Sequence, residues 1–164
     1  MNPTSETEDR GSAERVRAPT EQRILSMRPD GVTGSSIEAV LRKRMDEFAQ
    51  AVRERDLERL MAFYAPDVVV FGARLPLETR GAAVHRQNVE QWFASFDGPL
   101  VFELHKLRIT PGDGAAFCHY FALVTGARSS NRTSGYWLRG TTCFARRDGE
   151  WLVTHEHLSM PSSM

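Results

Sequence analysis

The first half of the chain has the apolar spacing of helices. Apolar side chains recur every three or four positions after Ser35, which predicts an amphipathic helix. Ser35 and Glu38 have the spacing of a capping box, so we expect this helix to begin at Ser35. Asp56 is a good N-cap for a second helix that reaches Tyr64, and Gly81 leads into a third. The apolar face of the first helix is formed by Ile37, Val40, Leu41, Met45, Phe48 and Val52.

The second half of the chain has the composition of long strands. Runs rich in aromatic and β-branched residues cover residues 100–110, 115–126, 136–146 and 151–161, and a shorter run covers residues 68–71. An Asp-Gly turn joins the last two long runs, and this dipeptide is a strong signal for a two-residue hairpin. Helices followed by an antiparallel meander indicate an α+β fold, with three N-terminal helices packed on one face of a curved antiparallel sheet.

Length, charge and cysteine content narrow the class of protein. The chain has 164 residues, and its 21 basic and 21 acidic side chains leave no basic surface for nucleic acid. No apolar run predicts a membrane span, and the start of the chain lacks the pattern of a secretory signal. Cys118 and Cys143 are expected to be buried free thiols of a cytoplasmic protein. Residues 1–35 are polar and are expected to form a disordered leader before a folded domain over residues 36–164.

The first strand of the C-terminal hairpin carries polar groups beside a large aromatic. Trp137, Arg139 and Thr141 share one face, because the side chains of a strand alternate with a period of two. A guanidinium in a dry pocket binds a carboxylate or an enolate oxygen, so Arg139 is the first candidate for a catalytic group. The alternative is that Arg139 pairs with an acidic residue at a sheet surface or a dimer interface.

Two further residues are candidates for a pocket. His119 lies between two phenylalanines on one strand face and is a candidate general base, because imidazole titrates near neutrality. The alternative is a half-buried histidine that bonds to a neighbour. Trp92 of the third helix is a candidate for the pocket wall or for the core. His85, which begins the same helix, is expected to be a surface residue.

Several short motifs are found together in this chain, namely Arg55 to Glu58, Phe63 to Val68, Gly81, Arg147 to Trp151, and His155 to His157. With these motifs the chain resembles, over Ile37 to Pro161, the superfamily of nuclear transport factor 2-like, ketosteroid-isomerase-like and SnoaL-like domains. The tail is also similar to the end of the association domain of calcium/calmodulin-dependent kinase II, which carries a comparable Arg-Arg-Asp-Gly, Trp and His-x-His run. The resemblance implies a cone-shaped sheet around a cavity, with the helices on its concave face, and a homodimer formed through the sheet.

The same resemblance argues against steroid isomerisation by the known mechanism. Counted along the chain, the carboxylate base, the tyrosine and the protonated aspartate of those enzymes fall on Gly72, Phe48 and Thr141, none of which has the required group. Related pockets place a hydroxyl in a hydrogen-bond network at the position of Tyr64. The alternative is that Tyr64 is an amphipathic core residue with its hydroxyl at the rim. The pocket arginines of the kinase association domain find no match, since the nearest residues are Ala122, Thr142 and Leu158.

The last strand carries His155, Glu156 and His157. The strand register of the isomerases points Glu156 inward, as a candidate acid or base with a raised pKa. The alternative is that Glu156 pairs with Arg139. In that register both histidines face the opposite side of the sheet, where a second subunit packs in this superfamily. If they face the cavity, they are candidates for substrate binding or for a shared metal ion, although no third ligand has a matching spacing.

Three hypotheses follow for the function. The first, which we favour, is a cofactor-independent isomerase, cyclase, dehydratase or hydrolase that acts on an apolar substrate with a polar oxygen. In it Arg139 binds the oxygen, while His119 or Glu156 moves the proton. The second is a non-catalytic ligand-binding or homo-association module of the kinase-association-domain type. The third is a metal site on His155 and His157. The first two need neither a metal nor a cofactor, and none of the three involves nucleic acid or a membrane.

Overall fold

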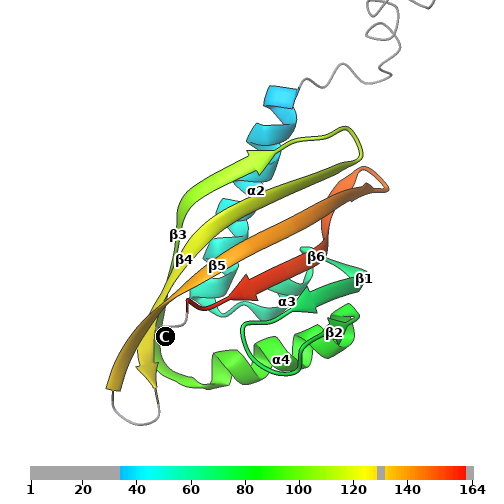
Figure 1. Cartoon of the computed structure of the whole chain (residues 1–164). Helices are drawn as coiled ribbons and strands as arrows, with labels where there is room; N and C mark the ends of the chain where they lie inside the picture. Colours follow the sequence, from blue (N-terminus) through cyan, green and yellow to red (C-terminus); the bar gives the residue numbers. More distant parts are fainter. Residues whose placement is uncertain (1–33, 129–131, 162–164) are drawn as a thin grey trace, which may run out of the picture. The chain divides into compact units, whose positions relative to one another are not determined.

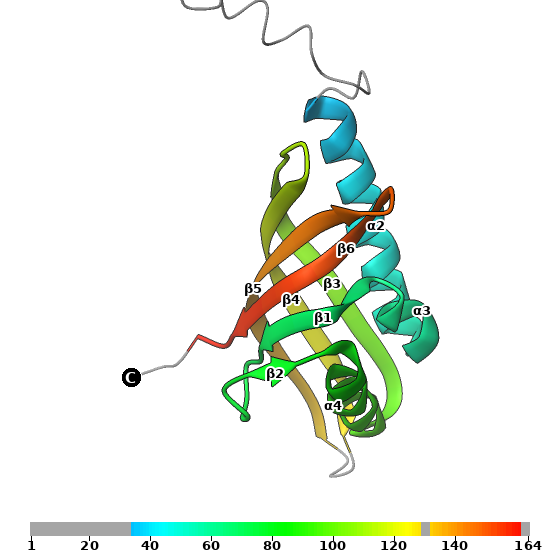
Figure 2. The ribbon, with the colours of Figure 1, turned by 90° about the vertical axis from the view of Figure 1, so that its right-hand side faces the viewer.

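Six strands form one curved, open sheet, and the helices lie against its inner face (Figure 1, Figure 2). The computed structural model describes residues 34–128 and 132–161. The predicted leader therefore lies outside the described residues, apart from its last two positions. No helix in the described ranges is long and apolar enough to cross a bilayer.

Helix α2 (Gly34–Glu54) confirms the first predicted helix. It begins one residue earlier than expected, so Ser35 lies in its first turn and is not the N-cap. Val40, which was predicted for the apolar face, is 52% exposed. The side chains that α2 buries recur at helical spacing, and they are Ile37, Leu41, Met45, Phe48, Ala49, Ala51 and Val52.

The second predicted helix is shorter than expected. Helix α3 (Leu57–Met61) is capped by Asp56, whose carboxylate accepts a hydrogen bond from the backbone N–H of Arg59 at 2.9 Å. Tyr64, predicted to lie in this helix, instead begins strand β1 (Tyr64–Phe71). The physical reason for the shorter helix is strand pairing. Tyr64 pairs with Val153 of the last strand of the chain, so the backbone is already extended at Tyr64.

The third helix follows two strands of the sheet. Strand β2 (Thr79–Arg80) pairs with β1 and leads through Gly81, at φ +85°, into helix α4 (Ala82–Ala94). A positive φ is readily available only to glycine, which explains this residue at the start of the helix. The strand predicted over residues 68–71 is confirmed as part of β1, so β1 and β2 separate α3 from α4 and the three helices are not one continuous N-terminal set.

The remaining strands form the expected meander. They are β3 (Phe96–Thr110), β4 (Ala115–Arg128), β5 (Arg132–Arg147) and β6 (Glu150–Ser159), and the sheet order is β2-β1-β6-β5-β4-β3. The hairpin between β5 and β6 is confirmed, with Asp148 and Gly149 both at positive φ, as a type I′ turn requires. The sheet is not wholly antiparallel, because β1 runs parallel to β6.

A bulge in β6 changes which side chains face inward. Phe144 pairs with Val153, but its neighbour Cys143 pairs with His155, so Thr154 is an extra residue in β6. Such an insertion shifts the alternation of the strand by one position. Val153 is therefore buried on one side of the bulge and Glu156 on the other.

Close packing against a glycine fixes one tyrosine of the inner face. Tyr120 of β4 lies directly opposite Gly140 of β5, and a Cβ atom at Gly140 would collide with the tyrosine ring. The ring is 3% exposed. Both cysteines are free thiols, and only Cys118 is fully buried, whereas Cys143 is half-buried.

We expect Gly140→Ala to destabilise the protein by about 1–3 kcal/mol, because the added methyl group must displace the ring of Tyr120. Urea unfolding measures the change. Gly114→Ala is the matched control, since a Cβ atom there meets nothing within 4 Å. Equal stability of the two variants would show that the ring moves without cost.

Candidate functional site

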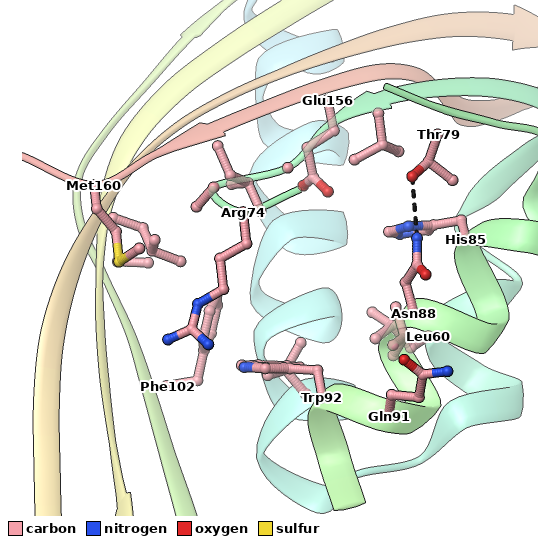
Figure 3. Close-up of a pocket in the computed structure, with 18 of the residues that line it drawn as sticks. Leu60, Arg74, Thr79, His85, Asn88, Gln91, Trp92, Phe102, Glu156 and Met160 are labelled. Carbon is pink, nitrogen blue, oxygen red and sulfur yellow. Dashed lines mark hydrogen bonds between the residues drawn. The ribbon is translucent and has the colours of Figure 1, made fainter. Parts of the chain in front are cut away.

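A cavity of about 400 Å³ lies between the inner face of the sheet and helices α2 and α4 (Figure 3). The loop between β1 and β2 forms part of its rim and contributes Arg74. Most of the wall is apolar, and it includes Phe48, Val52, Leu60, Val70, Val89, Phe102, Ala122, Leu138, Leu158 and Met160.

A single carboxyl group lies in this wall. Glu156 of β6 is 2% exposed. Its Oε2 accepts a hydrogen bond from the hydroxyl of Tyr64 at 3.0 Å. Its Oε1 lies 3.4 Å from the hydroxyl of Tyr120 and 3.5 Å from that of Thr142. Hydroxyls from three strands, β1, β4 and β5, thus surround the carboxyl of a fourth.

Burial controls the protonation of this cluster. It raises the pKa of Glu156 to about 7, because a charged carboxylate is poorly solvated there, although the three hydroxyl bonds act in the opposite direction. Burial, together with the nearby carboxylate, also raises the pKa of Tyr64 and of Tyr120 well above 10, so both phenols keep their protons. Glu156 therefore exchanges a proton near neutral pH beside two permanent hydroxyl donors.

His85 is a second titratable group of the wall. It lies in the first turn of α4, is 7% exposed, and its ring lies edge-on to the ring of Tyr64 at 4.5 Å between centroids. Burial lowers the pKa of His85 to about 4, so the imidazole is neutral at physiological pH. Its buried Nε2 has no hydrogen-bond partner among the described residues. A buried polar atom without a partner costs about 1–3 kcal/mol, which makes this position unusual for a residue that only packs.

Two hydrogen bonds connect α4 to the sheet around the cavity. The side-chain amide of Asn88 donates to the hydroxyl of Thr79 at 3.0 Å, and the indole N–H of Trp92 donates to the hydroxyl of Tyr136 at 3.1 Å. All four residues line the cavity. The polar atoms of Trp92 are thus engaged in holding the helix to β5.

The predicted residues of β5 lie outside the cavity. Trp137, Arg139 and Thr141 do share a face, but it is the outer face of the sheet, because the buried side chains of this strand alternate with them and include Leu138, Thr142 and Phe144. Trp137 is 45% exposed. The prediction that these three residues share a face is therefore confirmed, whereas the prediction that this face lines the cavity is wrong.

The sheet separates two predicted catalytic groups, Arg139 and His119, from the cavity. Arg139 is exposed, and its Nε donates to the hydroxyl of Ser159 at 3.2 Å, so it neither enters the cavity nor pairs with Glu156. His119 is also exposed and lies opposite Thr141 on the outer face. The predicted placement of Arg139 and His119 in the cavity is therefore wrong. Alternate residues of a strand face opposite sides of the sheet, and both of these residues occupy positions that face outward.

Both histidines of β6 face outward, as the isomerase register implied. The Nδ1 atom of His155 lies 2.9 Å from the carbonyl oxygen of Val69, and the ring of Phe71 contacts the rings of both His155 and His157. Of the two orientations considered for these histidines, the structure has the outward one, so neither lines the cavity as a substrate-binding residue. The described residues contain no cluster of three or more His, Cys, Asp or Glu side chains arranged to hold a metal ion.

Three predicted residues, Glu156, Tyr64 and Trp92, do line the cavity. Sequence reasoning missed Tyr120 and Thr142, and it placed His85 on the surface. A signal for the first two exists in the chain. Tyr120 and Thr142 lie an even number of positions from the small and apolar residues of their strands that form the inner face, so they point to the same side. No local pattern reveals the burial of His85, since it depends on where α4 crosses the sheet.

Comparisons with known proteins agree with this architecture. The family model of the SnoaL-like domain matches residues 41–163. A nuclear transport factor 2-like protein of unknown function from Pseudomonas putida KT2440 is 30% identical, with a TM-score of 0.72 over 82% of this chain and 92% of that one. No curated protein matches the chain.

Two more distant structures are similar in fold alone. A candidate dehydratase of the nuclear transport factor 2-like family from Streptomyces avermitilis is 15% identical, with a TM-score of 0.71 over 80% of this chain and 100% of that one. The association domain of calcium/calmodulin-dependent kinase II from C. elegans is 14% identical, with a TM-score of 0.61 over 77% of this chain and 98% of that one. Both families named from the sequence motifs are thus found among the structural neighbours.

The buried carboxyl predicts an unusual dependence of stability on pH. In the unfolded chain Glu156 has its ordinary pKa of 4.5, and in the folded protein its pKa is about 7. Between these values the unfolded chain loses the proton first, so the contribution of Glu156 to stability is lost as the pH rises. We expect this loss to be on the order of 3 kcal/mol, and Glu156→Gln should remove it.

Urea unfolding of the wild type and of Glu156→Gln across this pH range tests the prediction. The variant should become the more stable protein as the pH approaches 7 and above. His85 acts with the opposite sign below its ordinary pKa of 6.5, but both proteins contain it, so their difference isolates Glu156. The exposed Glu150→Gln on the same strand is the control. A constant difference across the range would contradict the raised pKa.

Proposed function

The chain belongs to the SnoaL-like domain family, and we propose that it is a cofactor-independent enzyme that moves a proton on an apolar small molecule in the cavity. The reaction type is that of an isomerase, a cyclase or a dehydratase. One observation carries this proposal: Glu156 is fully buried beside an apolar cavity, and its pKa is near 7. A carboxyl group with this pKa can accept and return a proton at physiological pH, which is what general acid–base catalysis requires.

The chemistry begins with the ionised Glu156. Its carboxylate takes a proton from a carbon beside a carbonyl group of the substrate, and the electron pair of the broken C–H bond moves to the carbonyl oxygen to form an enolate. In an isomerisation the neutral Glu156 returns this proton to a second carbon. In a dehydration the enolate re-forms the carbonyl and expels a β-hydroxyl group, which takes the proton from Glu156 and leaves as water.

Hydroxyl and imidazole groups beside Glu156 support this role. Tyr64 donates to the carboxyl at 3.0 Å and so orients it toward the cavity. The neutral imidazole of His85 contacts Tyr64, and its Nε2 has no hydrogen-bond partner among the described residues, so this nitrogen is the polar group that would bind a ligand oxygen at this corner. In this proposal His85 takes the oxygen-binding role first expected of Arg139. The candidate dehydratase among the structural neighbours is in keeping with such chemistry.

Self-association is a second proposed property, and the outer face of the sheet favours it. Phe117, Phe121 and Trp137 are each 40–45% exposed there, which is unusual for large aromatic side chains on one face. A two-fold axis would bring this patch against the same patch of a second copy. We propose a homodimer formed through this outer face. The same dimer would serve the alternative function, a non-catalytic ligand-binding or association module.

The proton-transfer proposal predicts exchange of acidic C–H protons. We expect the wild type to accelerate the exchange of the α-protons of 2-tetralone with D₂O, measured by proton NMR near neutral pD. Glu156→Gln should reduce the rate at least about 100-fold, because the amide cannot accept the proton. The rate should rise as the pH increases through about 7, where Glu156 ionises.

Glu150→Gln serves as the matched control for this experiment, because Glu150 is an exposed glutamate of the same strand. It should exchange 2-tetralone at the wild-type rate. If Glu156→Gln also kept the wild-type rate, Glu156 would not be the base, and the association module would become the better account of the domain.

The proposed dimer predicts that charge on the outer face separates the subunits. The double variant Phe121→Glu and Trp137→Glu should sediment as a monomer, whereas the wild type sediments as a dimer, because like charges would face each other across the interface. Leu77→Glu is the control, since Leu77 is 83% exposed but lies in the loop between β1 and β2. A double variant that remains dimeric would place the interface elsewhere.

A further inference from the structure

The rim of the cavity contains a single basic side chain. Arg74 follows β1, and no other lysine or arginine lines the cavity among the residues that the structure describes. Figure 3 shows its side chain reaching into the pocket, with the guanidinium on the side of Phe102 and away from Glu156. The residue as a whole is exposed, so the guanidinium lies where the cavity meets solvent.

Among the described residues, Arg74 has no acidic partner, unlike two other arginines whose charge is paired. Arg80, on the neighbouring strand, pairs with Glu78 at 2.7 Å, and Arg147 pairs with Asp67 at 2.6 Å. No hydrogen bond or ion pair of the Arg74 side chain is found within residues 34–128 and 132–161. Arg74 also makes no contribution to the pKa of Glu156, which is set by burial and by three hydroxyls. The cation and the carboxyl therefore act at two separate places in one cavity.

We propose that Arg74 binds the carboxylate of an otherwise apolar substrate, so that the substrate class of this cavity is a hydrophobic organic acid. This inference rests on the proposed function, whose site it completes. A guanidinium offers two parallel N–H donors that match a carboxylate, and such charge-assisted pairs are stronger than neutral hydrogen bonds. A single cation suits a monoanion better than a phosphate dianion, which would need further positive charge.

The arrangement also fixes the direction in which the substrate binds. The carboxylate stays at the solvent-exposed rim on Arg74, where its desolvation costs little. The apolar body then lies against the wall formed by residues such as Phe102 and Leu138, and the other end of the molecule approaches Glu156. The reverse orientation would bring a second carboxylate beside Glu156, which burial and like charge both disfavour.

A matched pair of probes tests this inference by calorimetry or naphthalene fluorescence. 2-Naphthoate carries the carboxylate, and 2-naphthamide is a neutral compound of nearly the same shape. We expect the wild type to bind the naphthoate about tenfold more tightly than the naphthamide. Arg74→Gln should abolish this preference by weakening the naphthoate alone. Arg80→Gln, which removes a paired arginine outside the cavity, should leave both affinities unchanged.

Several outcomes would overturn the inference: a wild type without a preference for the naphthoate, an Arg74→Gln variant that keeps the preference, or a wild type that binds neither probe. The Glu156→Gln variant separates this result from the proposed function. If it keeps the preference for the naphthoate and loses proton exchange, both proposals stand. If it keeps both, the anion site stands and Glu156 is not the base.

Discussion

The burial of one carboxyl group, that of Glu156, is the constraint on which the rest of the domain depends. A carboxyl in an apolar wall is tolerated only when hydrogen bonds offset the loss of water. Tyr64, Tyr120 and Thr142 provide these bonds from three strands, so β1, β4 and β5 must be in register with β6 for the group to be buried at all. The bulge at Thr154 is what turns Glu156 toward them.

The same wall shows that this domain gives up stability to keep reactive groups in its cavity. Glu156 is less easily ionised and His85 less easily protonated than in water, and in the part of the chain that the structure describes His85 has a ring nitrogen without a hydrogen-bond partner. Apolar side chains of similar size at these two positions would fill the space without such a cost. Their presence in one wall, joined through Tyr64, is better explained by a role in binding or chemistry than by packing.

Local patterns in the sequence were sufficient for the elements but not for the choice of face. The periodicity of α2 and the Asp-Gly turn each reflect interactions within a few residues, so both were predictable. Trp137, Arg139 and Thr141 were correctly grouped by strand parity, yet aromatic residues occur on both faces of this sheet, so hydrophobicity alone did not identify the inner one. The bulge at Thr154 leaves no clear local signal, and Glu156 was oriented only through the resemblance to a known register.

The division of the sheet into two faces separates the two proposed properties of the domain. The exposed aromatic patch around Phe121 and Trp137 lies on the outer face, whereas Glu156 faces inward and Arg74 lies on the rim between β1 and β2. A second copy on the outer face would therefore leave the rim open to solvent. Because adjacent residues of β5 and β6 face opposite sides, the register that sets the cavity wall also sets the patch. Any change of register in these strands would alter association and binding together.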